Sequence, residues 1–144
     1  MKLYTIGFTQ TKAQNFFDRL EKAGVKSVLD TRLNRVSQLA GFAKQADLSF
    51  FLERLSGIHY SVEQSLAPTA DMLDAYRKKE IGWSEYERRY LELLNARKVE
   101  NSIDMTKLDY CCLLCSEAKP DHCHRRLAAN YLAEARDNIT IIHL

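Results

Sequence analysis

Short apolar runs alternate with amphipathic segments along the chain. The runs at residues 3–6, 25–29, 58–62, 110–114 and 139–143 are four or five residues long. Runs of this length between turn-forming residues predict β-strands. The run at 110–114 is the most apolar, so we expect it at the centre of a sheet, where both of its faces are covered.

The segments between these runs carry apolar residues at helical spacing. Such stripes lie within residues 13–20, 48–55, 69–98 and 127–135, and each predicts helix with one apolar face. Trp83, Tyr86 and Tyr90 lie at helical spacing and are predicted to be core residues rather than a stacking surface. Local signals for helix ends are capping-box spacing at Thr11/Gln14 and Ser84/Glu87, an N-cap at Asp47, and stops at Gly24 and Gly57.

The order of the predicted elements indicates the fold class. Strands and helices alternate over the whole sequence, without internal repeats, low-complexity stretches or linkers. This order predicts a mostly parallel sheet with helices on both faces, because parallel strands need crossover connections. We therefore expect residues 1–144 to form a single α/β domain of the Rossmann-like, three-layer kind.

Composition and charge narrow the function classes. The 144 residues are 46% hydrophobic, with five Gly and two Pro, which is typical of a globular chain. Lys and Arg number 21 against 19 Asp and Glu, so the net charge of +2 gives no general affinity for nucleic acid. The basic residues Arg77, Arg88 and Arg89 are interleaved with Glu and predict a solvated surface. No apolar stretch approaches the ~18 residues of a membrane span, and we expect a cytoplasmic protein.

Polar residues of unusual type gather where the predicted strands end. In an open parallel sheet, ligands bind in the crevice beyond the carboxyl ends of the strands. A lone Gly7 after the first strand permits close approach of a backbone or ligand. The residues predicted to share this edge are Gly7, Thr9, Arg32, Cys115, Glu117, Cys123, His124 and Arg125.

The segment 113–126 supports three chemical interpretations. The start of the last helix, with Arg125 nearby, could bind a phosphate or carboxylate. Alternatively, Cys123 is an activated thiol beside histidine and arginine at a helix N-terminus. In the third interpretation Cys115, Cys123 and a histidine bind zinc, but the order C-x7-C-H lacks the paired spacing of structural zinc sites. We therefore assign no metal or cofactor from the sequence.

A purely structural interpretation also remains open. The four cysteines, at positions 111, 112, 115 and 123, lie within thirteen residues, which is unlike an extracellular disulfide framework. They could be buried reduced thiols, with Arg125 paired to Glu117 or Asp30. A C-x5-R phosphatase loop is excluded, because the sixth residue after each candidate cysteine is not arginine, and no G-x-G-x-x-G or P-loop motif occurs.

Several blocks of the sequence resemble the DUF488 family, a domain of unknown function. They are Tyr4-Thr5-Ile6-Gly7, Asp30-Thr31-Arg32, Gly41-Phe42, Gly57-Ile58-x-Tyr60, and Leu114-Cys115-x-Glu117 with Cys123-His124-Arg125. The resemblance implies an intracellular α/β domain and no particular activity. Phe8 stands where the family commonly has histidine, and residues 33–38 lack its Pro and Ser-Arg pair, so a mechanism that needs histidine at position 8 is in doubt.

These observations lead to one functional hypothesis and two alternatives. We expect a phosphate-bearing ligand, either a small molecule or a nucleic-acid end, in the crevice at Gly7, Thr9 and Arg32. Glu117, Cys115 and His124 would be the catalytic groups of a hydrolysis or transfer at a nucleoside or phosphate, while Cys123 and Arg125 would contact the ligand. The alternatives are a non-catalytic binding or regulatory module and a cysteine-based redox or sulfur-handling protein. The sequence does not indicate an oligomeric state.

Overall fold

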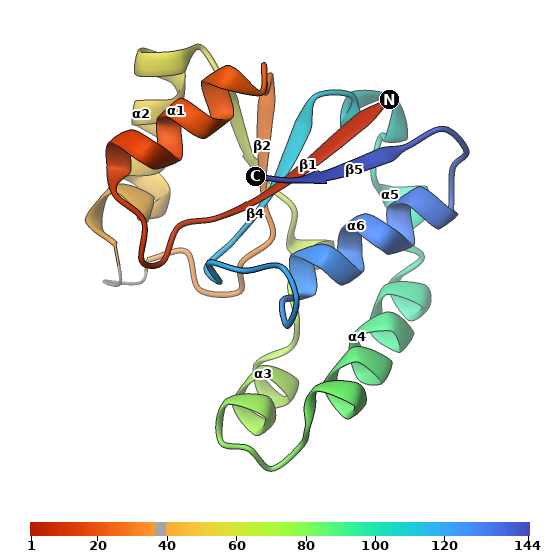
Figure 1. The fold of residues 1–144 in the computed structure, drawn as a ribbon. Helices are drawn as coiled ribbons and strands as arrows, with labels where there is room; N and C mark the ends of the chain where they lie inside the picture. The colour runs from red at the N-terminus through yellow and green to blue at the C-terminus, as the bar shows by residue number, and fades with distance from the viewer. Residues whose placement is uncertain (37–39) are drawn as a thin grey trace.

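In the part of the chain that the structure describes, five strands run parallel in one sheet of order β3-β2-β4-β1-β5 (Figure 1). The computed structural model describes residues 1–36 and 40–144. Ser37 and Gln38, which belong to the stretch 33–38 that differs from the family pattern, lie outside the described residues. The strands are β1 (Lys2–Gly7), β2 (Ser27–Asp30), β3 (His59–Val62), β4 (Cys111–Cys115) and β5 (Thr140–His143). The predicted α/β architecture is therefore confirmed, with β4 in the middle of the sheet.

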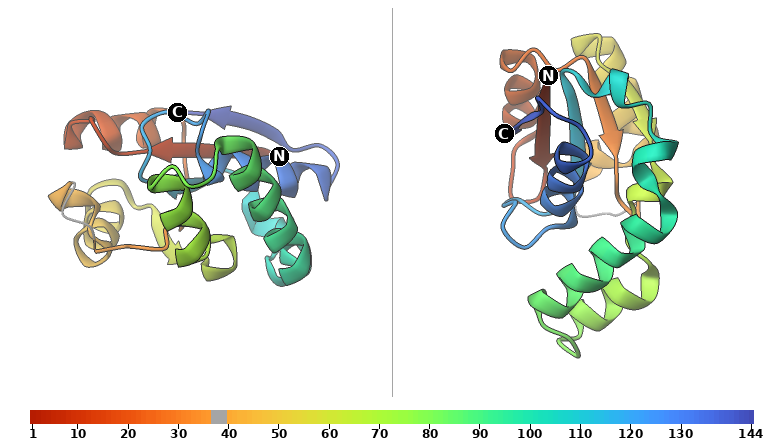
Figure 2. Two further views of the ribbon diagram at one scale, coloured as in Figure 1. Left: turned by 90° about the horizontal axis from the view of Figure 1, so that it is seen from below. Right: turned by 90° about the vertical axis from the view of Figure 1, so that its right-hand side faces the viewer.

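Helices cover both faces of the sheet. In the described part of the chain they are α1 (Ala13–Lys22), α2 (Gln45–Ser56), α3 (Ala70–Arg77), α4 (Trp83–Arg97), α5 (Val99–Ser102) and α6 (His124–Glu134). Short 3-10 turns occur at Gly41–Ala43, Gln64–Leu66 and Met105–Leu108. Helices α1 and α2 pack on one face, whereas α4 and α6 pack on the other (Figures 1 and 2). None of the described helices is both long and apolar enough to cross a membrane.

Strand β4 separates the two cores. All five of its residues are buried, and their side chains alternate between the faces as the pleat requires. Cys111 and Leu113 belong to the core beneath α4 and α6, while Cys112 and Leu114 belong to the core beneath α1 and α2. The predicted opposite orientation of Cys111 and Cys112 is thus confirmed.

The predicted helix starts are wrong, whereas the predicted stop at Gly57 is confirmed. Helix α1 begins after Lys12, and the Thr11 hydroxyl donates to the Thr9 carbonyl instead of capping it. Helices α2 and α4 begin after Lys44 and Gly82, also without a side-chain cap. Gly57 ends α2 with φ of 61°, a left-handed conformation that favours glycine.

The α3–α4 hairpin, residues 70–97, extends past the carboxyl edge of the sheet (Figures 1 and 2). The second half of α4 packs against α6 through residues such as Tyr90 and Leu94, which are fully buried. The carboxyl ends of the strands and the hairpin therefore face each other, and the space at this edge of the sheet is enclosed on two sides.

Candidate functional site

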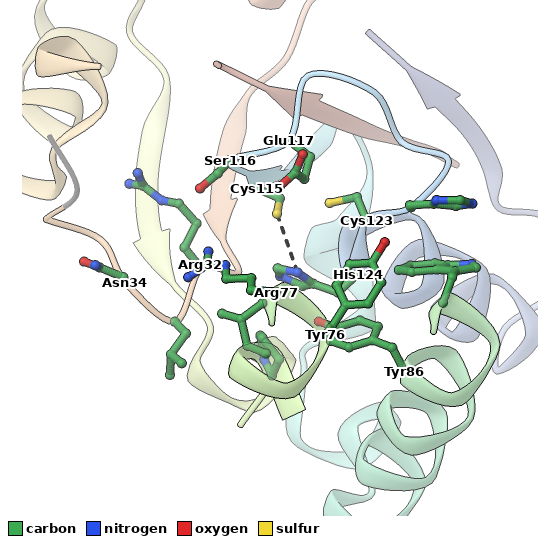
Figure 3. A pocket seen from close by; sticks show the side chains of 15 residues that line it. Arg32, Asn34, Tyr76, Arg77, Tyr86, Cys115, Ser116, Glu117, Cys123 and His124 are labelled. Atoms are coloured by element: carbon green, nitrogen blue, oxygen red, sulfur yellow. Dashed lines mark hydrogen bonds between the residues drawn. The ribbon is translucent and has the colours of Figure 1, made fainter. Parts of the chain in front are cut away.

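A cavity of about 450 Å³ opens between the carboxyl edge of the sheet and the α3–α4 hairpin (Figure 3). Its polar wall comes from the ends of β2 and β4 and from the start of α6, where Arg32, Cys115 and His124 lie. Its other wall is aromatic and comes from the hairpin: Tyr76, Trp83 and Tyr86. The cavity lies at the edge that the sequence predicts.

Two cysteines and a histidine meet on the polar wall. Cys115 is the last residue of β4, Cys123 is the N-cap of α6, and His124 is the first residue of that helix. Their two Sγ atoms and one ring nitrogen lie within 4.8 Å of one another. Cys115 Sγ is 3.5 Å from His124 Nδ1, the contact that is dashed in Figure 3. All three residues are buried, but they line the cavity.

The backbone after β2 fixes the orientation of the His124 ring. His124 Nε2 is 3.0 Å from the Thr31 carbonyl oxygen and 3.1 Å from the Thr31 hydroxyl. That hydroxyl itself donates to the Leu114 carbonyl, so both Thr31 oxygens act as acceptors toward the ring. The hydrogen is therefore assigned to Nε2 by the network, which leaves the Nδ1 position facing the two sulfurs.

The surroundings of the two thiols shift their pKa values in opposite directions. A hydrogen bond with Cys123 and the adjacent His124 hold the pKa of Cys115 well below its usual range, although burial opposes this effect. Burial and the neighbouring Cys115 raise the pKa of Cys123. Burial acts to lower the pKa of His124, but the negative charge on Cys115 outweighs it and raises that pKa. Of the two thiols, Cys115 is therefore the more acidic and Cys123 the less acidic.

Arg32 is a buried cation among the residues that line the cavity. Its Nε and Nη2 donate to the Asp30 carboxylate at 2.9 and 2.8 Å, and Tyr60 donates to the same carboxylate at 2.5 Å. Phe8 lies beneath the guanidinium, with its ring centre 5.1 Å from Cζ. Among the described residues, no hydrogen-bond partner reaches the buried Nη1 of Arg32. A buried N–H group without a partner is costly.

Gly7, Thr9 and Arg125 lie behind the polar wall rather than on it. Arg125 is fully buried and donates to the backbone carbonyls of Glu117 and Ala118. The Thr9 hydroxyl and backbone N–H both donate to the Ser116 carbonyl. A Cβ atom on Gly7 would lie only 1.6 Å from the Glu117 carbonyl oxygen. These three residues are predicted to contact the ligand; in the structure they hold the loop of residues 116–123 against β1 and are not among the residues that line this cavity.

Residues 12–132 match the sequence model of the family described as Domain of unknown function DUF488. The chain belongs to the DUF488 family. The same comparisons found no match among curated proteins and none among solved structures. The matched part of this DUF488 domain includes the whole lining of the cavity, while Gly7 and Thr9 precede it.

Four functional candidates of this DUF488 domain were not assigned from the sequence. Tyr76 and Arg77 come from α3, and Trp83 and Tyr86 from α4; all four line the cavity. Tyr86 is buried as predicted, yet it forms part of the cavity wall. Trp83 stacks on His122, with ring centres 4.9 Å apart and planes at 19°. Helical spacing shows which residues share a face, but not that the hairpin extends past the sheet.

Glu117 lies on the exposed rim of the cavity, two residues after Cys115. Its backbone carbonyl is held by Arg125, whereas its carboxylate makes no ion pair within the described chain. The predicted alternative, in which Arg125 pairs with the side chain of Glu117 or with Asp30, is wrong: Asp30 pairs with Arg32.

Proposed function

We propose that this DUF488 domain binds a small anionic ligand with a planar group, such as a nucleotide or a nucleic-acid end, and acts on it. The observation that carries the proposal is the buried Nη1 group of Arg32, which has no hydrogen-bond partner among the described residues and belongs to a residue that lines the cavity. A ligand oxyanion that reached this group would give it an acceptor. Arg77 adds a second cation at the same cavity. Phosphate oxygens are suitable acceptors, because arginine recognises them with paired N–H groups.

The aromatic wall supports a ligand larger than phosphate alone. Trp83 and Tyr86 are stacked with ring centres 5.4 Å apart, and Tyr76 lies 5.0 Å from Tyr86. Together they give the cavity an apolar side opposite Arg32, which suits a planar ring such as a base. The volume of about 450 Å³ is within the range of small-molecule sites.

Glu117 is the proposed proton acceptor of the reaction. A carboxylate on the rim can accept a proton from a ligand hydroxyl or from water. In this proposal the reaction class is hydrolysis or transfer at a nucleoside or phosphate. Arg32 and Arg77 hold the anion while the aromatic wall orients the ring.

Thermal unfolding with inorganic phosphate, a nucleoside and a nucleoside monophosphate tests the binding. A monophosphate at 100 times its dissociation constant should raise the free energy of unfolding by about 2.7 kcal/mol. At the same concentration, the nucleoside alone and inorganic phosphate alone should each raise it by less. Arg77→Gln should weaken binding of the monophosphate and of phosphate, whereas Trp83→Leu should weaken mainly the monophosphate. Arg89→Gln is the matched control, because Arg89 is paired with Glu85 on α4 and does not line the cavity.

The outcomes separate the proposal from its alternatives. If no phosphate compound stabilises the protein, the anion site is refuted. If binding occurs but no nucleoside or phosphate ester is turned over, the domain is a binding module. If turnover is found and Glu117→Gln leaves it intact, Glu117 is not the proton acceptor.

A further inference from the structure

The geometry points to a metal site: Cys115, Cys123 and His124 bind a zinc ion whose remaining coordination position opens into the cavity. The three donors come from the end of β4 and the start of α6, and their donor atoms lie within 4.8 Å of one another. Two thiolates and an imidazole are ligands that zinc prefers. This site goes beyond the proposed function, because it would bind metal whether or not a nucleotide enters the cavity.

The separation of the donors fits tetrahedral coordination. With Zn–S near 2.3 Å and Zn–N near 2.05 Å, a sulfur and a nitrogen ligand lie about 3.6 Å apart across a tetrahedral ion. Cys115 Sγ and His124 Nδ1 are 3.5 Å apart. Two thiolates at the same bond length lie about 3.8 Å apart, within the 4.8 Å limit that encloses all three donor atoms. The cluster therefore needs only small adjustments to receive an ion.

The surroundings of His124 are those of a metal-binding histidine. Such a residue nearly always donates its second ring N–H to a carbonyl or carboxylate, which fixes the ring. Here Nε2 is 3.0 Å from the Thr31 carbonyl oxygen, and Nδ1 faces the sulfurs. Thr31 is anchored in turn, because its backbone N–H and its hydroxyl both donate to the Leu114 carbonyl.

The charge of the cluster is also suitable. Two thiolates balance the charge of a divalent ion, so the metal-bound cluster would bury no net charge, and binding would release the thiol protons to solvent. Arg125 Nη1 lies 3.6 Å from Cys123 Sγ and can donate a hydrogen bond to it. A thiolate ligand accepts such a bond.

The proposed zinc site has three protein ligands and leaves one coordination position for another ligand. Structural zinc sites have four protein ligands, often in closely spaced pairs, whereas catalytic sites have three and leave a position for water or substrate. The spacing C-x7-C-H therefore argues against a structural zinc site, but not against a catalytic one. Since all three residues line the cavity, the open position faces the same space as Arg32 and Glu117.

Metal binding by the untagged protein tests the inference directly. The wild-type protein should hold about one equivalent of zinc by elemental analysis after incubation with zinc and desalting. With cobalt(II) in place of zinc, it should show the near-ultraviolet thiolate-to-cobalt charge transfer and the intense visible bands of a tetrahedral thiolate site. Cys123→Ser and His124→Gln should each weaken zinc binding by more than about 100-fold, beyond the effect usual for outer-shell changes.

Two variants serve as matched controls. Cys112→Ala removes a buried thiol on the opposite face of β4, and His59→Gln removes an exposed imidazole; neither should change the zinc content or the cobalt spectrum. Circular dichroism checks the fold of each variant. A wild-type protein with no bound zinc and no charge-transfer band would overturn the inference, as would a Cys112→Ala variant that loses metal as fully as Cys123→Ser. Neither result would bear on anion binding, which is measured separately.

Discussion

At the scale of single residues, the polar wall of the cavity contains a buried ion pair between Asp30 and Arg32. Asp30 is fully buried and Arg32 is 2% exposed. A buried ion pair adds little stability relative to an apolar pair, but removing one partner leaves the other charge without compensation. Tyr60 belongs to the same network, since its hydroxyl donates to Asp30, and burial together with this carboxylate raises the pKa of Tyr60 above its usual value.

The Asp30→Ala variant should therefore be strongly destabilised. Its free energy of unfolding should fall by about 3–5 kcal/mol, because Arg32 stays buried without its carboxylate. Urea unfolding followed by circular dichroism measures the change. Arg88→Ala is the control, since Arg88 and its partners Glu85 and Glu92 are exposed, and its unfolding midpoint should change little. Equal midpoints for the two variants would show that the Asp30–Arg32 pair is not required.

Individual site residues were only partly predictable from the sequence. Cys115, His124 and Arg32 line the cavity as expected, because strand ends and a helix start meet at one edge of a parallel sheet. Arg125 does not, although it directly follows His124. Successive side chains of a helix point about 100° apart, so His124 faces the cavity while Arg125 faces β1. The register of α6 on the sheet decides between them, and this register depends on tertiary packing.

At the scale of elements, the loop between β4 and α6 positions the cluster. Arg125 and Thr9 donate to its carbonyl groups from one side. Gly7 allows the chain to pass directly over β1, in contact with the Glu117 carbonyl. The loop joins Cys115 to Cys123, and its path therefore sets the distance between the two thiols.

Gly7→Ala should disturb this loop. The added methyl group would lie 1.6 Å from the Glu117 carbonyl oxygen and 2.8 Å from Arg125 Nη1, so the backbone must move. Overpacking of this kind costs about 1–3 kcal/mol, which chemical denaturation can measure. Gly41→Ala is the matched control, because its Cβ would meet no atom within 4 Å. Equal stability of the two variants would show that the loop moves without cost.

The sequence predicted the positions of the strands more accurately than the starts of the helices. Each strand lies within a residue or two of its apolar run. Burial on both faces gives the central strand β4 a clear signal, whereas the edge strands β3 and β5 are only partly buried. The capping boxes failed because they require a specific side-chain hydrogen bond, and the Thr11 hydroxyl donates to Thr9 instead. Helix α4 begins at Trp83, whose ring packs against Tyr76 and His122. These contacts join three segments and are not visible in any local pattern.

At the scale of the whole molecule, the two walls of the cavity differ in how firmly they are held. Strand β4 is central and buries all five of its residues. Helix α3 buries Met72 alone among its eight residues, and it lies past the edge of the sheet (Figure 2). Local opening requires little free energy where few apolar contacts are lost. The polar wall is therefore the fixed part of the site, and the aromatic wall is the part that can open.

Amide hydrogen exchange should reveal this difference. Without ligand, amides of α3 should exchange through low-energy local opening, while those of β4 should exchange only on global unfolding. A nucleoside monophosphate that contacts Arg77 and Trp83 as well as Arg32 would connect both walls, so it should slow exchange in α3 and in the first turns of α4. Its effect on β4 should be no larger than the gain in global stability. Equal protection of α3 and β4 in the free protein would show that the hairpin is as firmly held as the sheet. Ligand protection that misses residues 70–90 would place the ligand elsewhere than between the two walls.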